Sequence, residues 1–173
     1  MVKIILKNDY KIKELTLKKQ KKLEILNQKC TDYYLLHDGV LPSKKEVLEI
    51  FDALPPGKNY KDKHVLGVYK CRNELIGIIE IIKNLPVNGE WMIGLLVIEP
   101  EERDNGLGKL IHEALSQWAI TLGAKSFRIG VIEENYKGKR FWSNLGYIKV
   151  NEETMVFTKK THIVNVMTYQ LAS

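Results

Sequence analysis

One stretch of this sequence, residues 91–132, constrains the fold more than any other, because a strand, a helix and a second strand follow each other directly. Its start, "WMIGLLVIEP", is apolar almost throughout, which is typical of a strand covered on both faces, and Gly94 predicts a bulge or a close backbone approach there. From Leu107 to Leu122, apolar residues recur every three or four positions, which predicts an amphipathic helix ending at Gly123. We therefore expect a parallel, right-handed strand–helix–strand crossover.

The rest of the chain adds strands and helices around this unit. Ser43 and Glu46 have the spacing of a capping box at the start of a helix, and the β-branched runs 64–70 and 74–82 predict a hairpin. The other expected elements are a strand at 2–8, a helix at 17–30, a connector at 31–42, a loop at 54–63, a short helix closed by Gly146, and strands at 147–158 and 161–171. A chain of 173 residues with these elements is expected to form one α/β (α+β) domain.

Composition and charge exclude several classes of protein. No apolar run approaches the roughly 20 residues that span a bilayer, and no signal-peptide pattern is present, so we expect a cytoplasmic protein without membrane contact. The net charge of +6 is concentrated in Lys13–Glu24, which is typical of a solvated helix face. That segment lacks interleaved aromatics, which argues against nucleic-acid binding. Cys30 and Cys71 are too few for a zinc site, so no metal is expected.

The turn "ERDNGLG" ahead of the predicted helix is the strongest candidate binding feature. Helix N-termini expose unpaired N–H groups, and Gly106 and Gly108 carry no side chains that would keep an anion away from them. Arg103 and Lys109 would add positive charge on either side. The spacing fits neither a Walker loop nor a dinucleotide fingerprint, which needs a small residue where Ile111 stands. From these residues alone, an anion site and a simple tight turn are equal alternatives.

Two motifs in this region resemble the GNAT superfamily of acetyl-coenzyme-A-dependent N-acetyltransferases. They are "LLVIEPEERDNGLGKLIHEAL", a strand with Arg-x-x-Gly-x-Gly and a long helix, and "IGVIEENYKGKRFWSNLGY", a strand, an asparagine and an aromatic helix ending in Leu-Gly-Tyr. The resemblance runs from about residue 64 to the C-terminus. It implies a mixed, mostly antiparallel sheet flanked by helices, whose central parallel strands splay apart to hold coenzyme A. It implies a single domain over 1–173, with a first strand and substrate-side helices in 1–63 and the coenzyme-binding core and C-terminal strands in 64–173.

The resemblance also implies which residues contact acetyl-coenzyme A, the co-substrate. The turn would wrap the pyrophosphate through backbone amides, and splaying near Val97 and Ile132 would make a slot for the pantetheine arm. Asn135 would meet the pantetheine end and Phe141 would pack beside the coenzyme; a helix cap and a core position are their respective alternatives. The full set is Leu96, Val97, Ile98, Arg103, Asp104, Asn105, Gly106, Leu107, Gly108, Lys109, Asn135, Gly138, Phe141 and Trp142.

The implied reaction is direct attack of a primary amine on the acetyl thioester, which needs a base because such amines are protonated near neutral pH. Glu80 is the first candidate base, because burial inside an apolar strand would raise its pKa; an outward-facing position is the alternative. Glu133, at the mouth of the parallel pair, is the second candidate. Family members often carry a tyrosine proton donor seven positions after the asparagine, but Trp142 stands there. Tyr136, water or unassisted departure of the thiolate would then replace it.

Two further questions stay open at this level. The departure at Trp142 favours, as an alternative, a catalytically silent acetyl-coenzyme-A-binding sensor or scaffold. Tyr33, Tyr34 and His37 would either line an acceptor pocket or seal the core beneath a loop. The expected acceptor is an amine-bearing small molecule or peptide, and no acidic cluster in the sequence marks a pocket for a polycation. We expect a monomer or a homodimer.

Overall fold

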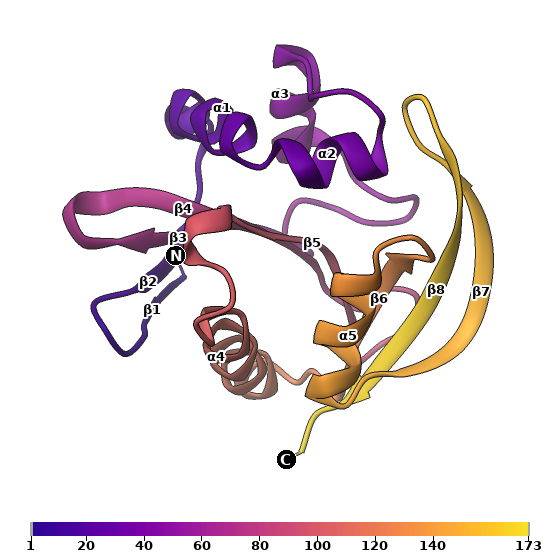
Figure 1. Cartoon of the computed structure of the whole chain (residues 1–173). Helices are drawn as coiled ribbons and strands as arrows, with labels where there is room; N and C mark the ends of the chain where they lie inside the picture. Colours follow the sequence, from indigo (N-terminus) through magenta and orange to yellow (C-terminus); the bar gives the residue numbers. More distant parts are fainter. Residues whose placement is uncertain (1, 173) are drawn as a thin grey trace.

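The computed structural model describes residues 2–172 and is built around one eight-stranded sheet in the order β1-β2-β3-β4-β5-β6-β8-β7 (Figure 1). The strands are β1 (Lys3–Ile5), β2 (Lys11–Glu14), β3 (Lys63–Lys70), β4 (Glu74–Ile82), β5 (Glu90–Ile98), β6 (Ser126–Ile132), β7 (Ile148–Val156) and β8 (Thr161–Gln170). Neighbouring strands are antiparallel except β5 and β6, which are parallel. The predicted mixed, mostly antiparallel sheet with a central parallel pair is confirmed.

Helices connect the strands and cover both faces of the sheet (Figure 1). They are η1 (Leu17–Lys19), α1 (Gln20–Lys29), α2 (Thr31–His37), α3 (Lys44–Asp52), η2 (Cys71–Asn73), η3 (Pro100–Glu102), α4 (Leu107–Thr121) and α5 (Tyr136–Leu145), where η denotes a short 3₁₀ helix. None of the helices within residues 2–172 has the length and apolar character needed to cross a membrane.

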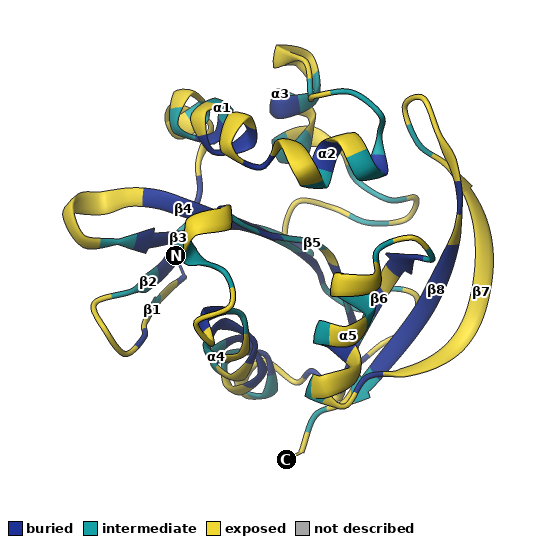
Figure 2. Cartoon of the chain, in the orientation of Figure 1, coloured by how far each residue is buried: buried dark blue, intermediate teal, exposed yellow. Residues whose placement is uncertain are grey.

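Two apolar cores hold these layers together. The core beneath α1, α2 and α3 includes Leu23, Leu26, Tyr34, Val47, Val65, Ile78 and Val97. The core beneath α4 and α5 includes Leu66, Ile79, Trp91, Leu107, Ile111, Leu115, Phe127 and Trp142. The strands at the centre of the sheet are therefore buried on both faces, whereas the outer faces of the helices are exposed (Figure 2). Apolar burial of this kind stabilises the fold by roughly 25 cal/mol per Å² removed from water.

The bulge predicted at Gly94 is confirmed. The β4–β5 register steps from the pair Glu80–Leu95 to the pair Ile81–Ile93, which leaves Gly94 as the extra residue on β5. A β-bulge of this kind re-aims the neighbouring side chains and bends the strand. The bulge at Gly94 therefore marks the point at which β5 bends and its register with β4 changes.

The predicted helix ends are also found. Ser43 Oγ accepts from the Glu46 N–H at 3.2 Å, while the Glu46 carboxylate accepts from the Ser43 N–H at 2.7 Å, so the capping box starts α3. Gly123, with φ +89°, follows the last turn of α4 in the left-handed conformation that glycine accommodates best.

Two predictions for the N-terminal third are wrong. The segment expected as a connector at 31–42 contains α2, and the first strand is shorter than 2–8 and pairs with β2, a strand that was not predicted. Helix α2 spans seven residues, too few to reveal a helical period, and it is held by its buried Tyr34. Tertiary packing rather than local propensity therefore decides this segment.

Candidate active site

The parallel strands β5 and β6 separate soon after they begin. They pair at Glu90–Ser126, Trp91–Phe127 and Met92–Arg128, and no further ladder pair joins them within residues 2–172. Beyond this point β5 stays paired with β4, and β6 stays paired with β8. The predicted divergence is confirmed, and it begins before Val97 and Ile132. The edges of β5 and β6 that face each other are left without a strand partner.

The turn ahead of α4 presents free backbone donors. Asp104 and Gly106 adopt left-handed φ values of +60° and +86°, and Asn105 Oδ1 accepts from the Leu107 N–H at 3.0 Å. Within residues 2–172, the N–H groups of Gly108 and Lys109 meet no acceptor. The start of this 15-residue helix therefore offers unpaired N–H groups and the positive end of its dipole to an anion.

The two glycines of the turn serve different purposes. A Cβ at position 106 would meet no atom within 4 Å, so Gly106 is needed for its backbone conformation. A Cβ at position 108 would lie 2.8 Å from Phe141 Cε2 and 3.8 Å from Ile98 Cδ1. Gly108 thus makes room for the Phe141 ring, a role that the sequence did not indicate. The end of β5, the start of α4 and the ring from α5 meet at this point.

Arg103 points away from the turn and holds α2. Its Nη1 lies 2.5 Å from Asp32 Oδ2, its Nη2 lies 3.2 Å from Asp32 Oδ1, and its Nε donates to the Ile98 carbonyl at 2.7 Å. The hydrogen bond from Arg103 lowers the pKa of Asp32. The side chain of Arg103 is therefore engaged, whereas Lys109 is 69% exposed and lies 3.9 Å from Glu113.

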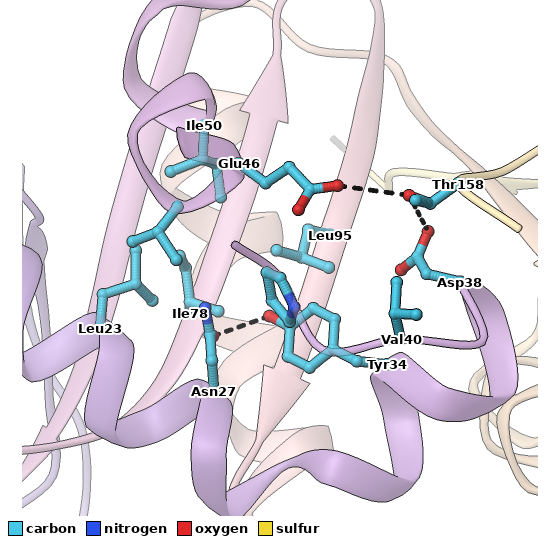
Figure 3. A pocket seen from close by; sticks show the side chains of 12 residues that line it. Leu23, Asn27, Tyr34, Asp38, Val40, Glu46, Ile50, Ile78, Leu95 and Thr158 are labelled. Atoms are coloured by element: carbon cyan, nitrogen blue, oxygen red, sulfur yellow. Dashed lines mark hydrogen bonds between the residues drawn. The ribbon is translucent and has the colours of Figure 1, made fainter. Parts of the chain in front are cut away.

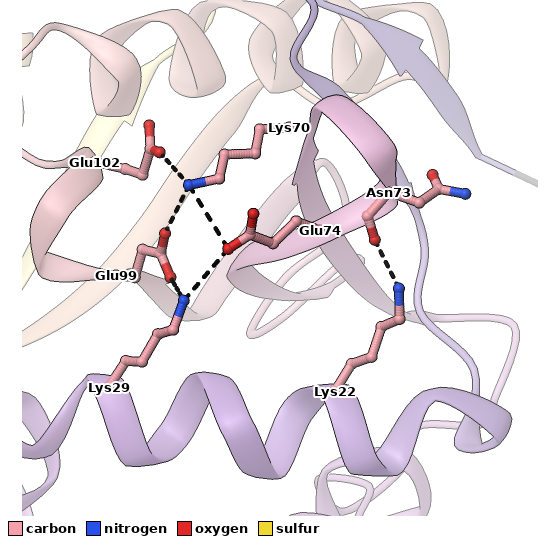
Figure 4. A network of polar contacts seen from close by, with 7 residues as sticks. All are labelled: Lys22, Lys29, Lys70, Asn73, Glu74, Glu99 and Glu102. Atoms are coloured by element: carbon pink, nitrogen blue, oxygen red, sulfur yellow. Dashed lines mark hydrogen bonds and ion pairs between the residues drawn. The ribbon is translucent and has the colours of Figure 1, made fainter.

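An ion network around the buried Glu99 lies at the start of the same turn (Figure 4). Glu99 is 1% exposed, and Lys29 and Lys70 lie 2.7 and 3.3 Å from its carboxylate. Lys70 also pairs with Glu102 at 2.8 Å, and Glu102 accepts from the Tyr10 hydroxyl at 2.7 Å. Glu102 raises the pKa of Lys70, and Glu99 raises the pKa of Lys29. The network ties α1, β3 and the β1–β2 hairpin to the residues that lead into the turn.

The geometry of strand, turn and helix agrees with the comparison to known families. The model of the Acetyltransferase (GNAT) family matches residues 29–147, more than half of the chain. This chain belongs to the GNAT acetyltransferase family. Enzymes of this family use acetyl-coenzyme A as acetyl donor. The match includes both motifs and also α2 and α3, which lie outside the segment with the sequence resemblance.

Individual relatives are more distant. The uncharacterized N-acetyltransferase YobR of Bacillus subtilis (strain 168) is 24% identical over 125 residues, and this chain spans 46% of that protein, about half its length. That alignment covers 70% of this chain.

Solved structures share the fold at low identity. An acetyltransferase from Salmonella typhimurium that modifies the N-terminal serine of ribosomal protein L7/L12 has a TM-score of 0.79 at 14% identity, covering 99% of this chain and 100% of that chain. An acetyltransferase from Thermus thermophilus has a TM-score of 0.78 at 17% identity, covering 96% and 100%. The spermidine N-acetyltransferase of Vibrio cholerae, solved with CoA and spermine, has a TM-score of 0.73 at 16% identity, covering 94% and 96%.

The second GNAT motif places its asparagine as a helix cap. Asn135 Oδ1 accepts from the Gly138 N–H at 2.9 Å at the start of α5, and a Cβ at position 138 would lie 2.6 Å from Asn135 Nδ2. Trp142 is 9% exposed and packs against His112 and Tyr147 in the core. In this structure Trp142 is therefore a core side chain, and the cap explains both Asn135 and Gly138.

Glu80 lies beside the bulge but is not a solitary carboxylate. Lys63 Nζ lies 2.7 Å from its Oε1, and the Lys63 side chain is 3% exposed. Glu80 is half-buried, between the expected buried and outward-facing positions, and the pairing of β4 with β3 brings Lys63 to it. A Cβ on Gly94 would lie 2.5 Å from Glu80 Oε2. The bulged glycine of β5 therefore leaves the space that this carboxylate fills.

The other two catalytic candidates lie nearer the surface. Glu133 pairs with Lys139 at 2.6 Å and accepts from Asn165 Nδ2 at 2.5 Å; the bond from Asn165, followed by that from Lys139, lowers its pKa. A carboxylate with a lowered pKa is a weaker base. Tyr136, at the first position of α5, is 71% exposed, and the Lys139 ammonium lies 4.9 Å from its ring.

A cavity of about 200 Å³ lies between α1, α2, α3 and the strands β4 and β5 (Figure 3). Ile78 and Leu95 contribute from the strands, and Tyr34 lines the cavity from α2. Of the aromatic residues proposed for an acceptor pocket, Tyr34 lines this cavity, while His37 is buried and stacks on Tyr33 with ring centroids 4.0 Å apart. Residues 2–172 contain no group of three or more His, Cys, Asp or Glu placed to hold a metal ion.

Proposed function

We propose that this chain transfers the acetyl group of acetyl-coenzyme A to a primary amine. The observation that carries the proposal is the convergence of three features on β5. Its unpaired edge faces β6, its end leads into the free N–H groups of Gly108 and Lys109, and its bulge holds Glu80.

The turn before α4 and the unpaired edge of β5 offer hydrogen-bonding groups that match those of coenzyme A. The free N–H groups of Gly108 and Lys109 suit a pyrophosphate, and the edge of β5 at Leu96, Val97 and Ile98 suits the amides of a pantetheine arm, as an added strand would. On α5, the Phe141 ring lies against Gly108 and would border the coenzyme, whereas Asn135, Gly138 and Trp142 keep the cap and core roles described above. Acetyl-coenzyme A supplies an acetyl group activated as a thioester.

Glu80 is the proposed general base. The acceptor amine arrives protonated, since its free pKa is about 10.4. An ammonium nitrogen has no lone pair, so one proton must leave before the amine attacks the thioester carbon. As the new C–N bond forms, the nitrogen becomes positively charged and acidic, and the nearby carboxylate can take its second proton while the C–S bond breaks. The Lys63 ammonium holds the Glu80 carboxylate in place, and Gly94 leaves it open toward β5. The leaving thiol, of pKa about 8.5, needs little acid assistance, and Tyr136 or water supplies the proton.

The acceptor is a primary amine of a small molecule or a peptide. Both classes occur among proteins with this fold, since one neighbour acts on spermidine and another on the N-terminal serine of a ribosomal protein. These neighbours are 16% and 14% identical to this chain, so they support the kind of nucleophile rather than its identity.

The first test removes the proposed base. Glu80→Gln is expected to lower kcat by about 10²-fold or more with the dissociation constant of coenzyme A unchanged, because the carboxylate lies beside the bulge and not in the turn. Gly94→Ala, whose methyl group would displace Glu80 Oε2, is expected to act in the same direction. The measurements are thiol release across a panel of amines and calorimetric titration with coenzyme A.

A control variant and a variant of the second candidate base show whether Glu80 is the general base. Glu153→Gln, on the exposed strand β7, is the control and should behave as the original chain. A loss of kcat in Glu133→Gln but not in Glu80→Gln would transfer the role of base to Glu133. Coenzyme binding without turnover of any amine would instead support a catalytically silent sensor or scaffold.

A further inference from the structure

The proposed base Glu80 is already paired with a buried cation. Lys63 Nζ lies 2.7 Å from Glu80 Oε1, and the Lys63 side chain is 3% exposed. The same ammonium donates to the Ala53 carbonyl at 2.6 Å. Ala53 caps the C-terminal end of α3, which is the end of a helix that attracts a cation. Because two acceptors hold it and the protein surrounds it, the Lys63 ammonium stays beside Glu80.

The two carboxylate oxygens of Glu80 face different groups. Oε1 is held by Lys63, whereas Oε2 lies at the bulge, 2.5 Å from the position that a Cβ on Gly94 would take. An amine that gave its proton to Oε2 would bring its nitrogen to within about 7 Å of the Lys63 ammonium, given ordinary hydrogen-bond lengths. Two cations at this separation repel each other strongly in a site from which water is largely excluded.

The second candidate base is paired with a lysine in the same way. Glu133 Oε1 lies 2.6 Å from Lys139 Nζ. Each of the two carboxylates considered for the reaction therefore already has its own ammonium partner, Lys63 for Glu80 and Lys139 for Glu133. A protonated acceptor would have to share one of these carboxylates with a lysine.

A tyrosine on α2 also lies within electrostatic range of Glu80. Burial, followed by the charges of Asp38 and Glu80, raises the pKa of Tyr33, so its hydroxyl is neutral at physiological pH. Asp38 Oδ1 lies 3.4 Å from Thr158 Oγ1, at the β7–β8 turn. Within residues 2–172, Lys63 is the charged group in contact with Glu80, and it offsets the charge that a reacting amine meets at the bulge.

The proton balance of the reaction distinguishes a neutral amine from an alkylammonium ion. A neutral amine and the thioester give an amide and a free thiol. The nitrogen loses one proton, which Glu80 takes as the C–N bond forms, and the departing sulfur gains one as the C–S bond breaks. An alkylammonium ion must lose a further proton before it can attack. Glu80 accepts one proton, so it serves a neutral amine completely and an ammonium ion only in part.

We propose that Lys63 determines acceptor specificity, because its ammonium makes the site select amines that are largely neutral in solution over alkylammonium ions. This inference rests on the proposed acetyl transfer with Glu80 as base. The favoured acceptor is a weakly basic amine such as the α-amino group of an amino-acid amide or a peptide, whose pKa is about 7.7–8.0, against about 10.4 for a lysine-like amine. At pH 7, roughly one α-amine in eight is neutral, compared with about one alkylamine in 2,500.

Two amines of similar size test the selection in the unaltered protein. Glycinamide carries a weakly basic α-amine, and 1-aminopropane carries a strongly basic one. At pH 7 we expect kcat/KM to be about 100-fold higher for glycinamide. Between pH 7 and pH 9, kcat/KM for 1-aminopropane is expected to rise about tenfold per pH unit with its neutral fraction, whereas the value for glycinamide levels off above about pH 8.

Variants at position 63 then assign the preference to the lysine. Lys63→Met removes the charge but keeps a long, unbranched side chain. The ratio of the two kcat/KM values at pH 7 is expected to fall at least tenfold, because the ammonium form of 1-aminopropane then meets an unpaired carboxylate. Lys63→Arg keeps the charge and should preserve the ratio. Lys61→Met, the same substitution at an exposed lysine two residues away, is the matched control.

Lysinamide gives a second readout, because it carries both kinds of amine in one molecule. The original chain is expected to acetylate the α-amine, and Lys63→Met should shift the product toward the ε-amine. Mass spectrometry of the product fragments distinguishes the two. If Lys63→Met does not fold, Lys63→Gln, which keeps a donor for the Ala53 carbonyl, takes its place.

The outcomes separate this inference from the proposed function. A preference for glycinamide below tenfold, or a kcat/KM for 1-aminopropane that does not change with pH, would overturn the selection while leaving acetyl transfer intact. A ratio that stays the same after loss of the Lys63 charge would also overturn it, because the preference would then come from the amines alone. If no amine is acetylated between pH 7 and pH 9, the proposed function itself fails, and this inference with it.

Discussion

At the scale of single residues, three glycines around the candidate site are required for three different physical reasons. Gly106 adopts a φ of +86° that other residues reach only with strain. Gly108 has no Cβ and so leaves space for the Phe141 ring, and Gly94 leaves space for the Glu80 carboxylate. Adding one methyl group therefore has a different consequence at each position. The sequence pattern alone shows the glycines but not which neighbour each one accommodates.

Gly108→Ala is expected to lower the free energy of unfolding by roughly 1–3 kcal/mol, the usual cost of overpacking, because its Cβ would lie 2.8 Å from Phe141. Phe141→Ala removes the obstacle, so the double variant should be more stable than the sum of the two single effects predicts. Denaturant unfolding of the four proteins measures the interaction energy. Simple additivity would show that the ring is not what requires the glycine.

At the scale of elements, the junction between α1 and α2 is attached to the candidate coenzyme turn at two points. Lys29, the last residue of α1, pairs with Glu99, and Asp32, in the first turn of α2, pairs with Arg103. The junction, residues 29–32, is thus joined at its first residue to Glu99 and at its last residue to Arg103. We therefore expect the order of α2 to depend on these two ion pairs.

Asp32→Asn is expected to loosen α2 without disturbing the sheet. The pair is partly exposed, so its loss should cost at most about 1 kcal/mol and accelerate amide hydrogen exchange in α2 by about two- to fivefold. Exchange in α4 and β6 should stay unchanged. Asp52→Asn, at the exposed end of α3, serves as the control. Equal protection of α2 in both variants would rule out the attachment as the source of its order.

Much of the core fold was readable from the sequence because the decisive signals are local. The apolar run with Gly94, the helical period that starts at Leu107 and the Ser43–Glu46 cap each depend on neighbouring residues, and the structure has all three. The aromatic segment at 31–37 carries no such period, which is why α2 was predicted as a connector.

The features that the sequence did not reveal depend on long-range register. Lys63 reaches Glu80 because β3 pairs with β4, and Glu99 meets Lys29 from a position 70 residues away. Arg103 was expected beside a phosphate because its spacing matches a motif, whereas the distant Asp32 holds its guanidinium. Charge partners of this kind are set by the assembled sheet and cannot be inferred from spacing.

At the scale of the whole molecule, several histidines are buried in the neutral form. Burial lowers the pKa of His112 to about 4, and it also lowers the pKa values of His37 and His64. His112 lies among aromatic rings, and its Nε2 is 3.1 Å from the Tyr147 hydroxyl. Because unfolding lets these rings take up protons below their ordinary pKa of about 6.5, acidification favours the unfolded chain.

The free energy of unfolding is expected to fall as pH decreases from about 6.5 to about 4, by roughly 3 kcal/mol for His112 alone. Below pH 4 the ring is protonated in both states, so its contribution is constant. His112→Leu should reduce the slope between pH 6.5 and 4 by about one proton. Guanidinium unfolding at several pH values measures the slope, and an unaltered slope would show that His112 is not the group responsible.

Strand β5 starts between two paired strands, but its pairing with β6 ends after three residue pairs. Its second half therefore has one edge without a strand partner. Extending the β5–β6 pairing to the remaining residues would add backbone hydrogen bonds and stabilise the fold. It would also pair the strand edges that are proposed to bind the coenzyme. The missing β5–β6 hydrogen bonds thus lower the stability of the sheet where the two strands separate. Variants selected only for thermal stability are expected to lose activity where they extend the β5–β6 pairing.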